Sequence, residues 1–169
     1  VQEYIEILER MYVLRTVPFI DLSSKLPVYR KNKKLYFQDP LIFHCFSGKN
    51  NGIGDNFFTE CLRFLNDPPG KSKLVESVVG MHIFRRYQNC FYWQGKKEID
   101  FVAREGNKLH FFEVKYQEKV SAAEFQWFKE ISPQGRRLSV ITKQDFQKHQ
   151  SISLIPAPVF LLRNIAELG

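Results

Sequence analysis

Three short apolar runs joined by tight turns limit the fold of this chain most strongly. The runs cover residues 90–93, 98–104 and 108–115, and the turns between them span 94–96 and 105–107. Side chains of alternating character over runs of this length predict β-strands. The second turn carries a Gly-Asn pair, which is typical of a tight hairpin. The middle of the chain therefore predicts three consecutive strands.

Helical patterns flank these strands. Residues 71–87 repeat apolar side chains at helical spacing, and a capping box at 121–124 opens a second helix that ends near residue 131. An apolar strand at 138–142 follows. The order α-β-β-β-α-β includes a helix that is long enough for a crossover connection. It predicts the α/β (α+β) class, with a mixed sheet flanked by helices.

The remaining segments predict shorter elements. A last strand and a closing helix are expected in the C-terminal part. In the N-terminal part, two β-like runs around a polar turn predict a hairpin. These expected elements are a helix over 2–14, strands over 27–30 and 35–37, helices over 41–46 and 56–65, a strand over 152–155 and a helix over 158–166.

Composition excludes several classes of protein. With 169 residues and 44% hydrophobic residues, the chain can build one domain, or one domain with a small appendage. No apolar run is long enough to span a bilayer, and no signal peptide is evident. Three scattered cysteines without a CxxC pair predict neither a disulfide framework nor a zinc site, and they favour the reducing cytoplasm.

The chain is basic, with 25 Lys and Arg against 18 Asp and Glu, a formal charge of +7. A basic domain favours anionic partners, of which nucleic acid is the commonest, although ordinary solubility charge explains the same excess. Lys31, Lys33 and Lys34 form a local cluster that either contacts phosphates or is a solvated turn. Composition alone does not choose between these interpretations.

One set of residues has the chemistry of a metal site. Asp100 lies in an apolar strand, and alternation puts Ile99 and Phe101 on the opposite face of that strand. Pairing through the 105–107 turn brings Asp100 near Glu113, with Lys115 beside them. Two carboxylates suit Mg²⁺, and a lysine can orient water or offset charge on a phosphate. The alternative is an exposed, salt-bridged strand face.

Asp100 followed thirteen residues later by Glu113-Val114-Lys115, within this element order, resembles the PD-(D/E)XK nuclease superfamily. More narrowly, residues 36–163 resemble the C-terminal domain of prokaryotic AAA+-type ATPases, whose function is uncharacterised. The proline of the superfamily name is replaced by Ile99. The segments that carry the narrower resemblance are Lys34-Leu35-Tyr36-Phe37-Gln38-Asp39-Pro40, Leu74-Val75-Glu76-Ser77-Val78-Val79, Tyr92-Trp93, Glu98-Ile99-Asp100-Phe101-Val102 and Glu113-Val114-Lys115.

The resemblance implies a restriction-endonuclease-like core and further site residues. Asp100 and Glu113 correspond to the ligands of Mg²⁺ or Mn²⁺, with Lys115 and Glu76 in the catalytic set. Gln126 corresponds to a polar position that faces the site in many relatives. The N-terminal helix and hairpin look like the end of a winged helix, in which Lys31, Lys33 and Lys34 contact DNA.

The same resemblance implies three units. These are a partial winged-helix-like segment over 1–46, a helix and linker over 47–70, and a PD-(D/E)XK nuclease-like domain over 71–169. It also implies an upstream ATPase domain in the same polypeptide, so that the chain is expected to be a fragment of a longer one. Gly70-Lys71-Ser72 imitates the end of a phosphate-binding loop, but position 65 is Leu65 where that motif requires glycine, so no ATPase activity is expected here.

Two functions follow as expectations. The first is a divalent-metal-dependent hydrolase of DNA phosphodiesters. The second is a catalytically inactive module that binds DNA or protein and retains the nuclease fold. The interpretation includes no membrane partner and leaves homo-oligomerisation open.

Overall fold

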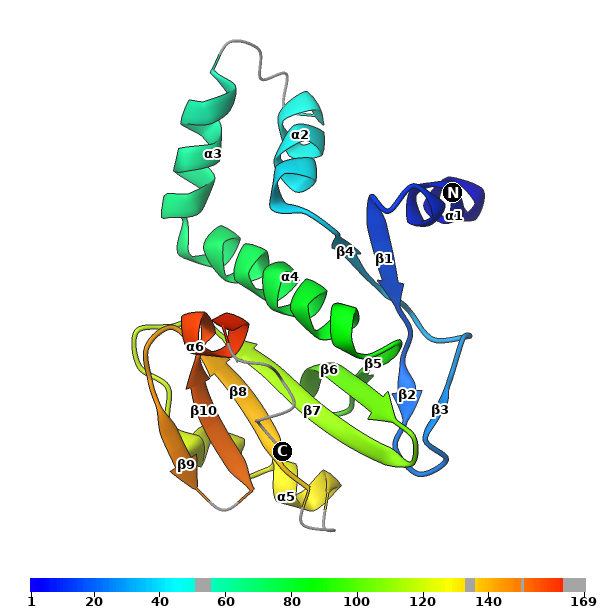
Figure 1. The fold of residues 1–169 in the computed structure, drawn as a ribbon, viewed down its shortest axis with the longest axis vertical. Coiled ribbons are helices and arrows are strands. Elements are labelled where there is room, and N and C mark those ends of the chain that lie inside the picture. Colours follow the sequence, from blue (N-terminus) through cyan, green and yellow to red (C-terminus); the bar gives the residue numbers. More distant parts are fainter. Residues whose placement is uncertain (51–55, 133–135, 150, 163–169) are drawn as a thin grey trace.

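The computed structural model describes residues 1–50, 56–132, 136–149 and 151–162 (Figure 1). Its elements in chain order are α1 (Gln2–Arg10), β1 (Leu14–Val17), β2 (Ile20–Asp21), β3 (Leu26–Pro27), β4 (Lys34–Phe37), α2 (Pro40–Asn50), α3 (Phe57–Asn66), α4 (Pro68–Arg86), β5 (Asn89–Gln94), β6 (Glu98–Glu105), β7 (Lys108–Lys115), the 3₁₀ helix η1 (Ala122–Phe125), α5 (Phe128–Ile131), β8 (Leu138–Thr142), β9 (Gln147–His149), β10 (Ile152–Pro156) and α6 (Ala157–Leu162).

A mixed sheet of six strands, in the order β5-β6-β7-β8-β10-β9, organises the molecule. The strands β5, β6 and β7 form the antiparallel meander that the tight turns predict. The crossover through η1 and α5 makes β8 parallel to β7, and β10 is parallel to β8. Strand β9 is the edge strand and pairs antiparallel with β10. The predicted α/β (α+β) class and mixed sheet are confirmed.

Helices cover both faces of this sheet (Figure 1). On one face α4 and α6 enclose a core that includes Phe101, Phe112 and Phe160. On the other face η1 and α5 enclose a second core around Phe111 and Phe128. The inner strands β6, β7, β8 and β10 are largely buried from both sides, which explains why the sequence reads there as near-continuous apolar runs, whereas the edge strand β9 is exposed. The continuous helix expected up to residue 131 is divided into η1 and α5.

Strand β6 does not alternate regularly as the sequence suggests. Between the Phe91–Val102 and Trp93–Ile99 pairs it has one residue more than β5, which marks a β-bulge. Ile99 therefore packs on the α5 side with Val102, whereas Phe101 packs on the α4 side. The prediction that Ile99 and Phe101 share a face is wrong, because the bulge shifts the alternation at Asp100.

The N-terminal segment begins with a helix as expected, but this helix ends at Arg10 rather than at residue 14, and Leu14 starts the strand β1. The small antiparallel pairs of this segment have other partners than predicted. Strand β4 pairs with β1, and β3 pairs with β2. The hairpin expected around the polar turn is therefore not formed. The long helix α4 starts at Pro68, inside the segment expected to be a linker, because the Asp67 carboxylate caps it by accepting from the Gly70 N–H at 2.9 Å. None of the helices in the described ranges is long and apolar enough to cross a membrane.

Candidate functional site

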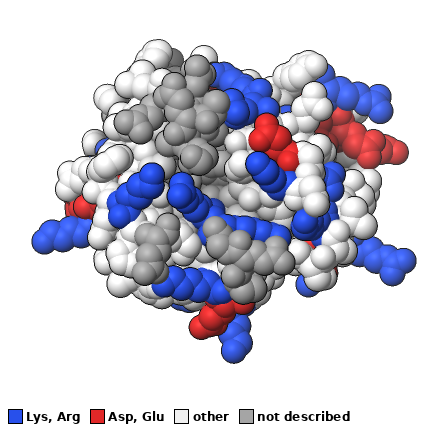
Figure 2. Space-filling model, turned by 60° about the horizontal axis from the view of Figure 1, so that its bottom comes forward, with Lys and Arg blue, Asp and Glu red and all other residues white. Residues whose placement is uncertain are grey.

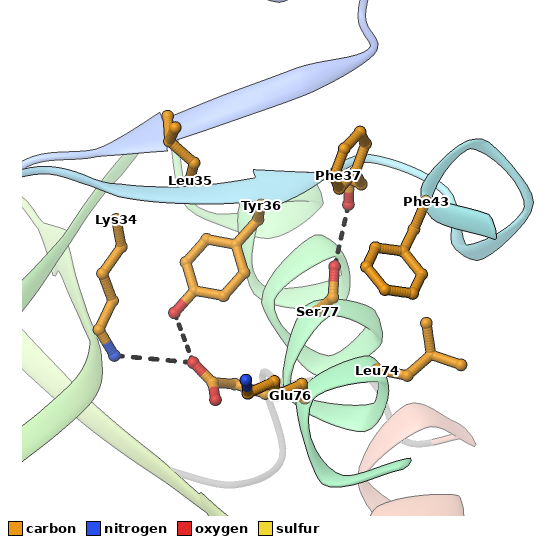
Figure 3. A pocket seen from close by; sticks show the side chains of 9 residues that line it. Lys34, Leu35, Tyr36, Phe37, Phe43, Leu74, Glu76 and Ser77 are labelled. Atoms are coloured by element: carbon orange, nitrogen blue, oxygen red, sulfur yellow. Dashed lines mark hydrogen bonds and ion pairs between the residues drawn. The ribbon is translucent and has the colours of Figure 1, made fainter. Parts of the chain in front are cut away.

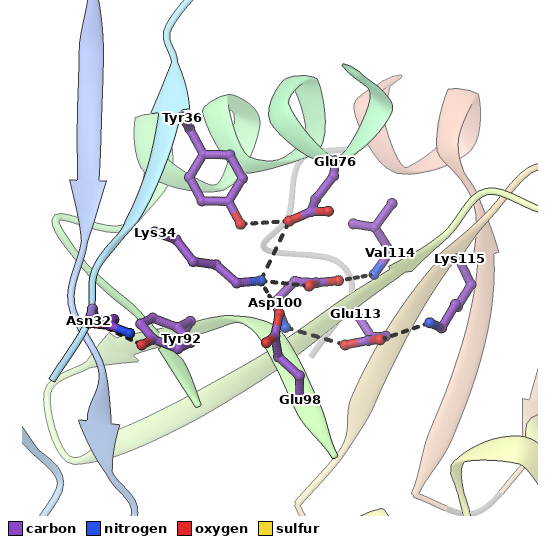
Figure 4. A network of polar contacts seen from close by, with 10 residues as sticks. All are labelled: Asn32, Lys34, Tyr36, Glu76, Tyr92, Glu98, Asp100, Glu113, Val114 and Lys115. Carbon is purple, nitrogen blue, oxygen red and sulfur yellow. Dashed lines mark hydrogen bonds and ion pairs between the residues drawn. The ribbon is translucent and has the colours of Figure 1, made fainter. Parts of the chain in front are cut away.

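Two buried carboxylates meet where β6 and β7 separate. The ladder between these strands ends at the Phe101–Phe112 pair, one step before Asp100 and Glu113. Beyond this point side chains take over the hydrogen bonds of the backbone. The Val114 N–H donates to Asp100 Oδ2 at 2.9 Å, and the Asp100 N–H donates to Glu113 Oε2 at 3.3 Å (Figure 4). Each carboxylate is thus oriented by a backbone donor.

A lysine from outside the sheet enters this group. Lys34 belongs to β4, and its Nζ lies 3.0 Å from Asp100 Oδ1 and 3.6 Å from Glu76 Oε1. It also pairs with the Glu98 carboxylate at the start of β6. The Lys34 side chain is only 21% exposed, so the ammonium is largely withdrawn from water. Figure 4 shows it pointing between the carboxylates.

Tyr36 comes from the same strand, two residues further on, and contacts the same group. Its hydroxyl donates to Glu76 Oε1 at 2.6 Å (Figure 3). The ring packs against Phe84 and Phe101 in the core under α4. Lys34 and Tyr36 lie on one face of β4, as the period of a strand requires. Strand β4 therefore supplies two donors to carboxylates that come from α4 and β6.

Burial changes the acidity of these groups. Removal from water, followed by the nearby Asp100 charge, raises the pKa of Glu113 to about 8. The same two causes raise the pKa of Glu76 above its ordinary value. Burial opposes the charge of Lys34, but Asp100, Glu98 and Glu76 outweigh this effect, so the pKa of Lys34 is raised. The clustered carboxylates therefore favour protonation of Glu113 and Glu76 and stabilise the nearby ammonium of Lys34.

Lys115 is at the solvent side of the pair. Its Nζ lies 3.6 Å from Glu113 Oε1, and its side chain is 41% exposed, against 8% for Glu113. The lysine can therefore hold a water or a phosphate oxygen beside Glu113 without losing its own hydration. The arrangement agrees with the expectation that Asp100, Glu113 and Lys115 lie together.

The four carboxylates of Glu76, Glu98, Asp100 and Glu113 form an acidic group around Lys34. A pocket of about 360 Å³ opens beside this acidic group, on the side of Glu76 (Figure 3). The segment from Lys34 to Phe37 forms one wall, and Leu74 and Glu76 from α4 form another. Most of its lining is apolar, and Lys34 and Glu76 are at the end that faces Asp100. The pocket gives solvent access to Lys34 and Glu76 from the β4 side.

The other predicted residues are not part of this group. Lys31 and Lys33 are exposed, and the Lys31 ammonium lies 5.1 Å from the centroid of the Phe19 ring. Gln126 is exposed as well, and its amide donates to the Ala122 carbonyl at 3.5 Å. Lys34 differs from its two neighbours because β4 turns it toward Asp100 rather than toward solvent.

Sequence reasoning assigned no site role to Tyr36 and Glu98, and it placed Lys34 on the outer surface. The alternation of Lys34 and Tyr36 along one strand face indicates that both side chains point the same way. Nothing in the sequence shows that this face meets Asp100, because the two segments are 66 residues apart.

Comparison with known families covers the part of the chain from α4 to α6. Residues 71–160, more than half of the chain, match the family described as Domain of unknown function (DUF4143). The chain belongs to the DUF4143 family. This domain is found at the C-terminus of AAA-type ATPases. The comparisons found no match among curated proteins and none among solved structures.

The DUF4143 match includes four members of the acidic group, Glu76, Glu98, Asp100 and Glu113, and it also includes Lys115. Lys34 and Tyr36 precede the matched residues. The site of this DUF4143 protein therefore combines residues from the family domain with two residues from the segment before it.

The donor set of the DUF4143 site suits a hard divalent cation. Asp100 Oδ1 and Glu113 Oε1 are carboxylate oxygens that accept from no backbone N–H in the described part of the chain, and both face an ammonium. Mg²⁺ and Mn²⁺ prefer such oxygen ligands and often take only one or two protein carboxylates. Asp100 and Glu113 fit this requirement.

Proposed function

We propose that this DUF4143 domain is a PD-(D/E)XK-like, metal-dependent hydrolase of nucleic-acid phosphodiesters. The supporting observation is the meeting of buried Asp100 and Glu113 where β6 and β7 separate, with Lys115 beside them (Figure 4). Asp100 and Glu113 are the residues that would hold Mg²⁺ or Mn²⁺. When bound, such an ion supplies Lewis acidity toward a phosphodiester.

The residues of the chain supply the rest of the chemistry. The backbone N–H groups of Asp100 and Val114 fix the carboxylates before any substrate arrives. Lys115 positions a water or a phosphate oxygen and offsets the negative charge that develops in phosphodiester cleavage. Burial and the Asp100 charge raise the pKa of Glu113 to about 8, so Glu113 would release its proton on binding a divalent cation.

A basic face supports an anionic polymer as the substrate. Figure 2 shows Lys and Arg side chains gathered around a hollow at the end of the molecule that Figure 1 draws at the bottom. Lys108 starts β7 and Arg137 directly precedes β8, and these parallel strands start at the same end of the sheet. Glu113 lies five residues further along β7 than Lys108, a distance of roughly 17 Å along the strand. This distance equals the length of about five base pairs of duplex DNA.

The decisive experiment compares cleavage with and without metal. Wild type, Asp100→Asn and Lys115→Met are incubated with duplex and single-stranded DNA in Mg²⁺, in Mn²⁺ and in EDTA. We expect metal-dependent cleavage by the wild type and a loss of about 100-fold or more in both variants. Glu130→Gln and Lys119→Met change exposed residues of the same types and serve as controls. Equal cleavage by wild type, Asp100→Asn and Lys115→Met contradicts the proposal.

One observation favours the second candidate, a module that binds nucleic acid without cutting it. The Lys34 ammonium contacts Asp100, Glu98 and Glu76, so part of the negative charge is neutralised by the chain itself. Such a module binds DNA in EDTA with a strong salt dependence and shows no turnover in any metal. The same incubations, with binding measured beside cleavage, separate the two candidates.

A further inference from the structure

The Lys34 ammonium lies at the carboxylate oxygen that a metal ion would use. Asp100 has two oxygens, and Oδ2 already accepts the Val114 N–H. Among the described residues no backbone N–H donates to Oδ1, and Lys34 Nζ lies 3.0 Å from it. A divalent cation on Asp100 Oδ1 and the ammonium of Lys34 compete for one position.

Two hydrogen bonds to α4 hold strand β4, and with it the Lys34 ammonium, in this position. The Tyr36 hydroxyl bonds to Glu76, and the Ser77 hydroxyl donates to the Phe37 carbonyl at 2.9 Å. These contacts fasten β4 along α4, close to the point where β6 and β7 separate (Figure 4). Strand β4 pairs with β1 and not with the six-stranded sheet. The Lys34 ammonium therefore belongs to the two-stranded β1–β4 sheet, whereas Asp100 and Glu113 belong to the six-stranded sheet.

The balance of charges around Asp100 and Glu113 favours the binding of one divalent cation. Four carboxylates, those of Glu76, Glu98, Asp100 and Glu113, share two ammonium groups in the described part of the chain, Lys34 and Lys115. With all of them ionised, negative charges exceed positive charges by two. With Lys34 withdrawn the excess grows to three, so a divalent cation is attracted more strongly.

We propose that Lys34 is a built-in competitor of the divalent cation, which lowers the metal affinity of the Asp100–Glu113 pair while β4 is seated. This inference rests on the proposed function, since it concerns the same metal site. The ion displaces the ammonium from Asp100 Oδ1, and the pocket beside Glu76 gives the displaced side chain access to solvent. The position of β4 then sets how much metal the site binds.

The test measures metal affinity directly, without substrate. Mn²⁺ is titrated by calorimetry into wild type, Lys34→Met and Lys33→Met, with Asp100→Asn as the variant that lacks the ligand. Methionine keeps an unbranched side chain that is one heavy atom shorter than that of lysine, and it removes the charge. Lys33→Met removes the same charge from the exposed neighbour. We expect Lys34→Met to bind Mn²⁺ at least tenfold more tightly than wild type, and Lys33→Met to bind like wild type.

The outcomes separate the two proposals. If wild type binds Mn²⁺ and Lys34→Met binds it equally or more weakly, the metal site stands and the role of Lys34 is overturned. If neither wild type nor Lys34→Met binds Mn²⁺ while both are folded by circular dichroism, the metal site itself is overturned. Tighter binding in Lys34→Met that Asp100→Asn abolishes supports both.

A measurement on the wild type alone covers the case in which Lys34→Met does not fold. Acylation of lysine amines is followed residue by residue by mass spectrometry, with and without Mn²⁺. We expect the labelling of Lys34 to increase when Mn²⁺ is added, because the ammonium leaves the carboxylates, whereas Lys33 labelling stays constant. Unchanged or reduced labelling of Lys34 overturns the proposal.

Discussion

At the scale of single residues, the site is defined by how each carboxylate oxygen is occupied. One oxygen of Asp100 and one of Glu113 accept a backbone N–H, and the remaining two face Lys34 and Lys115. Burial, followed by the neighbouring Asp100 charge, disfavours the ionised form of Glu113, which accounts for its raised pKa. The acidity of Glu113 therefore affects the stability of the fold as well as its chemistry.

This coupling predicts a pH dependence of stability in EDTA. The pKa of Glu113 is about 8 in the fold against 4.5 as its ordinary value, because of burial first and Asp100 second. Between these values the folded state holds a proton that the unfolded state releases, so its contribution to stability is complete below about pH 4.5 and is lost as the pH rises through about 8. Urea unfolding at pH 5 and pH 8 measures this effect.

The matched variants are Glu113→Gln, which cannot titrate, and Glu130→Gln, which changes an exposed carboxyl. We expect the unfolding free energy of wild type and of Glu130→Gln to fall more between pH 5 and pH 8 than that of Glu113→Gln. A parallel change in all three proteins contradicts the buried-acid interpretation.

At the scale of elements, the packing of α4 on the sheet places Glu76 above the β6–β7 separation. The close approach depends on Gly80, where an added Cβ lies 2.7 Å from Phe101 Cζ. Phe101 is fully buried and packs against Tyr36 and Phe84, so it has no space to move. The helix and the sheet are thus held in contact by a glycine in a helix interior.

Gly80→Ala tests this contact. Alanine improves helix propensity by about 1 kcal/mol, but overpacking a filled core costs about 1–3 kcal/mol. We expect a net loss of about 1 kcal/mol or more in unfolding free energy, measured by urea denaturation. Arg85→Ala, at an exposed position of the same helix, is the control for propensity and is expected to stay within about 0.5 kcal/mol of wild type. A stabilised Gly80→Ala protein contradicts the packing argument.

At the scale of the whole molecule, charge is distributed between two ends of the sheet. The acidic group lies where β6 and β7 separate, and the basic face of Figure 2 is at the starts of β7 and β8. Arg104 and Lys25 stabilise this end, since Arg104 Nη1 donates to the Lys25 carbonyl at 2.9 Å and Lys25 Nζ donates to Asn107 Oδ1 at 2.8 Å. Hydrogen bonds within the domain therefore hold the backbone and basic side chains at this end in place.

Charge reversal on this face tests its role. Lys108→Glu and Arg137→Glu change exposed residues at the basic end, and Lys119→Glu makes the same change in charge at the end of the connection after β7. In EDTA, fluorescence anisotropy with duplex DNA should show an affinity about tenfold lower for the first two variants than for Lys119→Glu, with a salt slope shallower by about 1 each. Equal affinities in the three variants contradict a nucleic-acid surface at this end.

The sequence by itself determined the order of elements from α4 to β8 and the proximity of Asp100, Glu113 and Lys115. This order and this proximity depend on periodicity, capping and tight turns, which act over a few residues and can be recognised in a single sequence. Only the tertiary structure decided that β4 pairs with β1, that a bulge shifts the alternation at Asp100, and that Lys34 and Tyr36 enter the site. Such contacts arise from packing between segments far apart in the chain, whose pairing and register no local pattern specifies.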